Sequence, residues 1–344
     1  MQKRSSRTTI HTFNGDSLTP ILLFRRLAGS EKFLFESSTK HEHSGRYSFI
    51  GSNPRKTYTG RGERLTEYVR ATNKTYTHEG NLHVLLKRLM PRISNVTDFP
   101  FSGGAVGFIQ HDTQPHVHFH IYETVIVFDH MTDMVTIIHT NIDAETVTPN
   151  IDALVTQLTT GETFEHRETF EAYRALRKEK PSSYLYYIEF PEQTVFGTAP
   201  ESFINVKQQR IHTHVITGAI KKGASYRENA VLIQDLRQNE HAAKLHADEI
   251  HARTEQLKKV SNAATVQLMK HTAALQSFDA IHLHSILQSE LSPVLHPIDA
   301  LTTCTLQHHV NNAVGCIGFN GQLDFTNAFD ATFEQHAQQT EVAQ

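Results

Sequence analysis

The sequence predicts an α+β fold built on antiparallel sheets, and two observations support this prediction. Many of the short apolar runs that are typical of strands come in neighbouring pairs with a few turn residues between them, as in residues 123–130 and 133–140. Such pairs form hairpins, whereas successive parallel strands need a long, usually helical, crossover. The helical stretches lie between groups of strands rather than after every strand, which disfavours a doubly wound parallel fold.

Composition narrows the class of protein. The 344 residues are enough for one large domain or two ordinary ones, and a hydrophobic content of 38% fits a globular chain. A net charge of -3 gives no reason to expect a nucleic acid or a membrane surface as partner. No apolar run reaches the ~20 residues of a membrane-spanning helix, and the basic N-terminus lacks the apolar region of a secretory signal. With only two cysteines, we expect a cytoplasmic protein.

The first half of the chain shows a helix, strands and a second helix before its β-rich part. Residues 18–28 have apolar positions at helical spacing after the start signal Thr19-Pro20. Further elements of this half are strands at 32–38 and 45–54, an amphipathic helix at 81–94, strands at 105–110, 123–130 and 133–140, and a helix from 150 that passes into a polar linker. That linker predicts a domain boundary, which divides the chain into residues 1–160 and 161–344.

The second half starts again with a helix. Its predicted elements are a helix at 169–181 and strands at 183–190, 193–200 and 202–216. A region rich in helix-forming residues follows from about Tyr226 to Leu275, in which Leu245, Leu257 and Val260 could form a buried stripe. Periodicity does not decide whether residues 281–291 form a strand or a helix.

Two histidine and glycine motifs have plain structural interpretations. His116, His118 and His120 alternate along a predicted strand and therefore share one face of it. Without an acidic or cysteine partner they favour a solvated face over a metal site. The glycines of residues 102–107 lack the spacing of a dinucleotide-binding loop and favour a tight turn that enters a buried strand.

Carboxylates at two places could carry chemistry. Asp248, Glu249 and Glu255 lie on one predicted helix, where carboxylates one or two turns apart could share Mg²⁺, although a solvated acidic face is the simpler interpretation. Glu201 follows Pro200 at the end of an apolar strand, where it could be a general acid or a turn residue.

The order of the segments identifies a resemblance. Residues 18–54, 102–112, 181–190, 197–206, 215–223 and 311–324 follow one another as in the large subunit of anthranilate synthase, component I, of the chorismate-utilising enzyme family. The resemblance extends from about Leu18 to Asp330 and implies two packed antiparallel sheets flanked by helices. It implies a lyase of tryptophan biosynthesis that converts chorismate and ammonia to anthranilate and pyruvate. It further implies Mg²⁺ as cofactor, a glutamine amidotransferase subunit as partner, and tryptophan as feedback ligand.

The resemblance also assigns site residues. Glu201 matches the glutamate of the family's S-P-E turn and is the catalytic acid candidate, while Glu255 matches one of two glutamates at the Mg²⁺ site. Five residues match the family's tryptophan pocket, although Leu185 stands for a methionine and Cys316 for a tyrosine. These are Ser37, Tyr184, Leu185, Val314 and Cys316.

Several catalytic motifs of the family are altered or missing. Ala252 replaces the other glutamate of the Mg²⁺ site, Val310 replaces a tyrosine, and Ile286 occupies the place of a histidine. Asp330 replaces an arginine, which reverses the charge at a carboxylate clamp. The family's glycine-rich loop has no counterpart between Leu301 and His309, and we expect the carboxylates that complete the Mg²⁺ site to be missing as well.

Three interpretations of the function follow. The chain is an anthranilate synthase component I-like protein with weak or lost activity. Alternatively, it is a non-catalytic homologue that binds tryptophan or the amidotransferase subunit. It could also be a shortened or altered product that barely folds, because deletion of central strands exposes apolar sheet edges.

Overall fold

The structure is a computed structural model. It describes residues 8–37, 45–91, 97–110, 116–142, 149–165, 167–277, 279–305, 312–328 and 331–335. None of the helices in these ranges combines the length and the apolar character that crossing a lipid bilayer requires.

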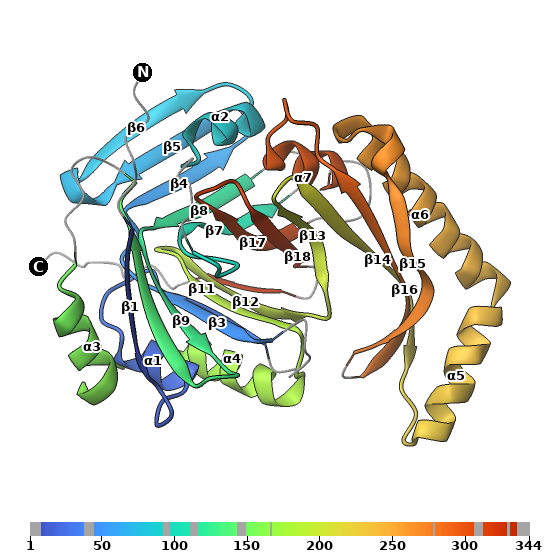
Figure 1. The fold of residues 1–344 in the computed structure, drawn as a ribbon, viewed down its shortest axis with the longest axis horizontal. Coiled ribbons are helices and arrows are strands. Elements are labelled where there is room, and N and C mark those ends of the chain that lie inside the picture. Colours follow the sequence, from blue (N-terminus) through green and yellow to red (C-terminus); the bar gives the residue numbers. More distant parts are fainter. Residues whose placement is uncertain are drawn as a thin grey trace, which may run out of the picture.

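Strands dominate the described part of the chain, as Figure 1 shows. The helices are α1 (Pro20–Arg26), α2 (Leu82–Leu89), α3 (Ile151–Thr160), α4 (Glu168–Glu179), α5 (Tyr226–Gln238), α6 (Glu240–Val260) and α7 (Pro297–Thr305), with 3₁₀ turns at Arg70–Thr72 and Ala263–Thr265. The strands are β1 (Thr8–Asn14), β2 (Phe33–Glu36), β3 (Tyr47–Gly51), β4 (Lys56–Arg61), β5 (Arg64–Val69), β6 (Lys74–Glu79), β7 (Gly104–Gln110), β8 (His116–Tyr122), β9 (Thr124–Asp129), β10 (Met134–Thr140), β11 (Tyr184–Glu189), β12 (Gln193–Ala199), β13 (Ser202–Lys207), β14 (Arg210–Lys221), β15 (Gln267–Gln276), β16 (Ala280–Glu290), β17 (Asn312–Gly318), β18 (Leu323–Asn327) and β19 (Thr332–Gln335).

The strands form two antiparallel sheets, which confirms the predicted α+β fold. Among the described residues, one sheet has the order β1-β10-β9-β3-β2-β11-β12-β19 and the other β15-β16-β14-β13-β18-β17-β7-β8-β4-β5-β6. We call them the eight-stranded and the eleven-stranded sheet. The predicted hairpin of β9 and β10 is present, with Asp129 opposite Met134 at its turn. Helix α1 begins as predicted, because the Thr19 side chain accepts a hydrogen bond from the Leu22 amide and Pro20 follows in the first turn.

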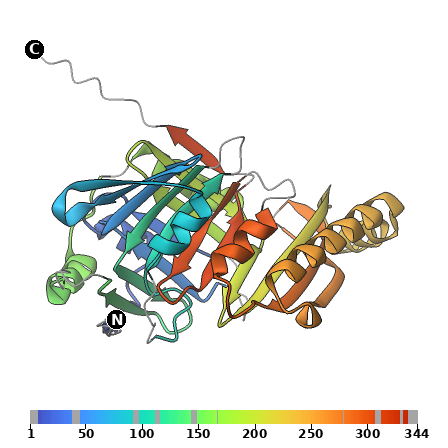
Figure 2. The same cartoon turned by 90° about the horizontal axis from the view of Figure 1, so that it is seen from above.

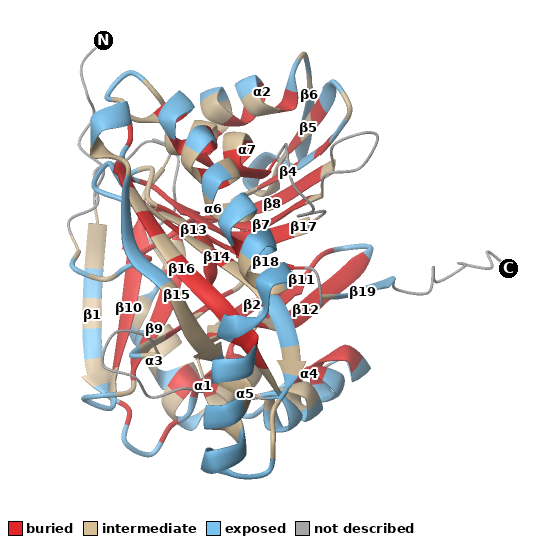
Figure 3. Ribbon diagram, turned by 90° about the vertical axis from the view of Figure 1, so that its right-hand side faces the viewer, coloured by how far each residue is buried: buried red, intermediate tan, exposed pale blue. Residues whose placement is uncertain are grey.

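Three large apolar layers form the core, one between the two sheets and one on the outer face of each. The layer between the sheets contains Phe33, Phe108 and Phe190. Helices α1, α3 and α4 pack on the outer face of the eight-stranded sheet, and α2, α6 and α7 pack on that of the eleven-stranded sheet (Figures 1 and 2). Helices α5 and α6 lie along β14, β15 and β16, where both helices expose their outward sides to solvent (Figure 3). Each sheet is therefore covered on both faces over much of its area.

Both sheets combine strands from the two halves of the chain. Strand β2 pairs with β11 in the eight-stranded sheet, and β7 pairs with β17 in the eleven-stranded sheet. The β7–β17 pair joins the two stretches that share the tripeptide Ala-Val-Gly, so the early and the late copy lie side by side. The boundary at residue 160 stays a prediction, and strands from either side of it are hydrogen-bonded neighbours.

The helical region predicted up to Leu275 is wrong in its last part. Helix α6 ends at Val260, and Gln267–Gln276 forms β15, which pairs with β16. The hairpin partner decides this, because a neighbouring strand satisfies the backbone groups that a helix would pair internally. Residues 281–291, left open between strand and helix, belong largely to β16. In the expected stripe, Leu257 and Val260 are buried, but Leu245 is 50% exposed.

The solvated histidine face is also a wrong expectation. His118 and His120 are buried, and His116 is only partly exposed. The ring of Phe190 lies 4.2 Å from that of His118 and 4.8 Å from that of His120, between centroids. Alternation correctly placed the three histidines on one face. That face, however, packs against the other sheet rather than water.

Candidate functional site

Glu201, the predicted general acid, lines a cavity of about 420 Å³ where β13 and β14 separate. The two strands pair over only four residue pairs, so the second half of β14 diverges beside the turn that carries Glu201. Helix α6 contributes Glu249 and Arg253 to the lining. We call this space the Glu201 cavity.

Two stacked histidines flank the acid candidate. Nδ1 of His214 lies 3.5 Å from Oε2 of Glu201 and 3.1 Å from Nε2 of His284 on β16. Burial lowers the pKa of His214 to about 4, with smaller contributions from His212 and Lys270. Burial also lowers the pKa of His284 to about 3. Both imidazoles are therefore neutral at pH 7, and Glu201 gains no compensating positive charge from them.

Arg253 is the buried cation of the Glu201 cavity. Its Nη1 donates a hydrogen bond of 2.6 Å to Oγ1 of Thr213, and its guanidinium lies 4.5 Å from the ring centroid of Phe203. Burial lowers the pKa of Arg253, and neighbouring Cys304 and Glu249 act in the opposite direction. A guanidinium keeps its proton even so, so it offers the cavity a fixed positive charge.

Glu255 does not join Glu201. It lies on the exposed side of α6, where its Oε1 is 2.6 Å from Nζ of Lys258. Helical spacing explains this, because Glu249 and Arg253 are four residues apart on one face, whereas Glu255 is two residues further on. No group of three or more His, Cys, Asp or Glu in the described ranges is arranged to hold a metal ion.

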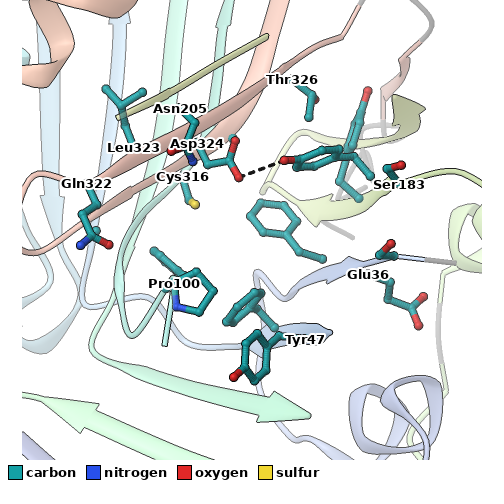
Figure 4. Close-up of a pocket in the computed structure, with 18 of the residues that line it drawn as sticks. Glu36, Tyr47, Pro100, Ser183, Asn205, Cys316, Gln322, Leu323, Asp324 and Thr326 are labelled. Carbon is teal, nitrogen blue, oxygen red and sulfur yellow. Dashed lines mark hydrogen bonds between the residues drawn. The ribbon is translucent and has the colours of Figure 1, made fainter. Parts of the chain in front are cut away.

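A second cavity, of about 570 Å³, lies between the two sheets. We call it the inter-sheet cavity, and Figure 4 shows part of its lining. All five residues that match the family's tryptophan pocket line it: Ser37, Tyr184, Leu185, Val314 and Cys316. The structure thus brings together residues that are far apart in the sequence.

Strand pairing explains this convergence. Leu185 of β11 is opposite Glu36 of β2, so Ser37 and the start of β11 lie at the same end of the eight-stranded sheet. Val314 and Cys316 alternate on β17 and share the face that packs into the layer between the sheets. Each sheet therefore supplies one side of the cavity.

A half-buried carboxylate lies in the inter-sheet cavity beside Cys316. Asp324 of β18 is directly opposite Cys316 in the β17–β18 ladder. Ser202 donates a hydrogen bond of 2.7 Å to its Oδ1, and the Tyr184 hydroxyl donates one of 3.4 Å to its Oδ2 (Figure 4). Burial raises the pKa of Asp324 to about 6, while hydrogen bonds from Ser202, Asn205 and Tyr184 act against this rise.

Glu36 gives the same cavity a second acid, which is buried and has a different environment. Its Oε2 is 3.1 Å from Nε of Arg177 and accepts a hydrogen bond of 2.7 Å from the Tyr173 hydroxyl. Burial raises the pKa of Glu36, and the charge of Arg177 partly offsets this. Glu36 is thus charge-compensated by helix α4.

Sequence reasoning missed Arg253 and Asp324. Period-two alternation could have found Asp324, because Leu323 and Phe325 belong to the core on the outer face of their sheet and so direct Asp324 to the other side. What alternation could not show is that this other side is the interior between two sheets.

Known proteins resemble this chain over most of its length. Residues 155–305 match the family model described as chorismate binding enzyme. Anthranilate synthase component 1 of Lactococcus lactis is 24% identical, over 85% of this chain and 79% of the relative. That of Bacillus subtilis is 24% identical over 85% and 73%. The chain is anthranilate synthase component I-like.

Solved structures share the fold of this anthranilate synthase component I-like chain. Anthranilate synthase component I from Streptococcus pneumoniae superposes with a TM-score of 0.66 at 20% identity, over 93% of this chain and 90% of that one. The menaquinone-specific isochorismate synthase from Escherichia coli gives a TM-score of 0.66 at 9% identity, over 96% and 86%. The names "component 1" and "alpha subunit" mark the anthranilate synthase relatives as parts of an assembly.

Proposed function

We propose that this anthranilate synthase component I-like chain binds tryptophan in the inter-sheet cavity and forms anthranilate weakly or not at all. One observation carries the proposal. Ser37, Tyr184, Leu185, Val314 and Cys316 come from three separate parts of the sequence and line one cavity. The two residues that the resemblance assigns to catalysis and Mg²⁺ binding, Glu201 and Glu255, do not line a common cavity.

The inter-sheet cavity has the properties of a small-molecule site. Its volume of about 570 Å³ lies within the range of roughly 300–1,000 Å³ in which ligand pockets fall. Aromatic side chains, among them Tyr47, Phe49 and Phe101, line it together with a few polar groups. An indole ring would bury apolar surface against such side chains.

The Glu201 cavity supports weak chemistry at most. Loss of one general acid or base typically costs about 10² to 10⁴ in rate. Here Glu255 points away from the cavity, Ala252 and Ile286 replace a carboxylate and a histidine, and Asp330 lies outside the described residues. Several such losses together leave little rate enhancement.

A residual lyase is the second candidate function. Glu201 and Glu249 share the Glu201 cavity with the buried guanidinium of Arg253, which offers one cation to a dicarboxylate such as chorismate. In this case Glu201 would be the general acid, a glutamine amidotransferase subunit would supply ammonia, and the protein would act in tryptophan biosynthesis. Added Mg²⁺ would then have to raise the rate.

Calorimetry and a fluorescence assay test both candidates. We expect saturable heat with L-tryptophan, and loss of that heat in Cys316→Phe, which fills the cavity. Cys304→Ala is the matched control, because Cys304 is a buried cysteine that does not line the cavity. A cooperative thermal transition must be shown for each protein, and it also excludes a chain that barely folds.

Two results would contradict the proposal. The absence of any heat with tryptophan would refute binding. Formation of anthranilate from chorismate, ammonia and Mg²⁺ at the rate of an ordinary synthase would refute the loss of activity and favour the second candidate. Co-purification with a glutamine amidotransferase subunit tests the partner separately.

A further inference from the structure

Asp324 is an acidic group of the inter-sheet cavity whose carboxylate has no cationic partner among the described residues. No described Lys, Arg or His forms an ion pair with its carboxylate, and its hydrogen-bond donors are the neutral side chains of Ser202, Asn205 and Tyr184. Glu36, in contrast, is held by Arg177. A desolvated carboxylate without a counter-charge is costly, and such groups usually meet a partner or a ligand.

The carboxylate faces open space rather than packed side chains. Asp324 is one of the residues that line the inter-sheet cavity, and Figure 4 shows it beside Cys316 and Asn205. Its neighbours along the chain, Leu323 and Phe325, lie on the opposite face of β18, where they belong to the core on the outer side of the sheet. The negative charge of Asp324 is therefore available to a ligand that enters the cavity.

We propose that Asp324 is the receptor for a protonated amine, so that the inter-sheet cavity selects aromatic ligands that carry an ammonium group. Aromatic side chains of the lining, such as Tyr47, Phe49 and Phe101, take the ring, and Asp324 forms a charge-assisted hydrogen bond with the ammonium. This inference rests on the proposed binding of tryptophan and names the residue that binds its amino group.

The same geometry disfavours aromatic acids without an amine. A ligand carboxylate beside Asp324 would place two negative charges in a site of low dielectric constant. Hydrogen bonds to charged groups contribute enough that loss of the ammonium is expected to weaken binding by roughly 10- to 100-fold.

Proton competition gives the site a recognisable pH profile. The pKa of Asp324 is raised to about 6 by burial, whereas the ammonium group of the ligand stays protonated around neutral pH. The titratable groups that face Asp324 are Tyr184 from β11 and Cys316 from β17, and burial raises the pKa of each. Lys207 from β13 lines the same cavity, together with Glu36, Arg46 and Asp98. Affinity should thus be greatest just above pH 7 and fall about tenfold per pH unit well below 6.

Calorimetry with three indole ligands tests the inference on the full chain. The ligands are tryptophan, tryptamine, which lacks the carboxylate, and indole-3-propionate, which lacks the amine. We expect tryptophan and tryptamine to bind at least about tenfold more tightly than indole-3-propionate, and Asp324→Asn to abolish this preference. Asp152→Asn is the control, because Asp152 is an exposed carboxylate on α3 that does not line the cavity. Thermal unfolding confirms that both variants fold.

The outcomes separate this inference from the proposed function. If tryptophan binds but Asp324→Asn leaves its affinity unchanged, or if indole-3-propionate binds equally well, Asp324 is not the receptor and tryptophan binding stands. If tryptophan does not bind but tryptamine does, the proposed function fails and the amine receptor stands. If none of the three ligands binds the folded wild-type chain, both are overturned.

Discussion

Gly107 of β7 and Gly315 of β17 lie directly opposite each other in the antiparallel ladder. A Cβ atom on Gly107 would overlap the carbonyl oxygen of His118 on β8, and one on Gly315 would overlap that of Asp324 on β18. These glycines are the shared residue of the two Ala-Val-Gly stretches. The tripeptide recurs because each copy has a neighbouring strand too close for a side chain.

Substitution of Gly315 should destabilise the protein. Gly315→Ala forces strand β18 away from β17, and such overpacking typically costs about 1–3 kcal/mol. Urea unfolding measures this loss. Gly318→Ala in the same strand is the control, because the nearest atom to its new Cβ is a movable Asn320 side-chain oxygen at 3.3 Å. Equal stability of the two variants would contradict the close approach.

Acid should unfold this protein through its buried histidines. Burial lowers the pKa of His120 to about 3 and that of His118 well below its ordinary value. Between pH 6.5 and about 3 the unfolded chain therefore binds protons that the folded chain does not, so stability is complete above pH 6.5 and falls as the pH drops. At pH 5 the loss is about 2 kcal/mol for His120.

Variants separate this effect from general acid sensitivity. His120→Phe should lose less stability than the wild type between pH 7.5 and 5.0 in urea unfolding. His251→Gln, at an exposed position of α6, should behave like the wild type. An unchanged pH dependence in His120→Phe would show that the buried imidazole is not responsible.

The buried pair of Glu36 and Arg177 should matter more than an exposed pair on the same helix. Glu36→Ala removes the partner of both Arg177 and the Tyr173 hydroxyl, and we expect a loss of about 2 kcal/mol, allowing for the partial exposure of Arg177. Glu171→Ala breaks an exposed pair with Arg174 and should cost under about 0.5 kcal/mol. A similar shift of the unfolding midpoint in both variants would count against the prediction.

Both cysteines should be unreactive in the folded chain. Cys304 and Cys316 are free and buried, and burial raises the pKa of each thiol, which keeps it from forming the reactive thiolate. An aromatic disulfide reagent should therefore titrate no thiols rapidly at pH 8 and two thiols in guanidinium chloride. Cys316→Ser should reduce the second number to one. Rapid reaction of the native protein would show that the inter-sheet cavity opens widely to solvent.

Local patterns predicted elements well and their surroundings poorly. Thr19-Pro20 placed the start of α1, and turn residues placed the hairpin of β9 and β10, because caps and turns are decided by near neighbours. The alternation around His118 predicted which residues share a face of the strand but not what covers that face. The sequence pattern of a polar face that packs against a second sheet is the same as that of a face exposed to water.

The candidate sites show the same limit. The resemblance grouped Ser37, Tyr184 and Cys316, and the structure places them in one cavity, but no spacing rule could join segments so far apart in the sequence. Which carboxylate of α6 reaches the Glu201 cavity depends on the rotation of the helix. Packing against β14 sets that rotation, so Glu249 lines the cavity and Glu255 does not.

The pairing of β7 with β17 has a consequence for synthesis on the ribosome. Strand β7 is almost wholly buried, yet one of its two neighbours, residues 312–318, is made about two hundred residues later. The nascent chain therefore presents an unpaired apolar strand edge for most of its translation, the kind of edge that invites aggregation. Pairing over such sequence separations also slows folding. Until residue 318 has emerged from the ribosome, the unpaired edge of β7 remains available for a chaperone to bind.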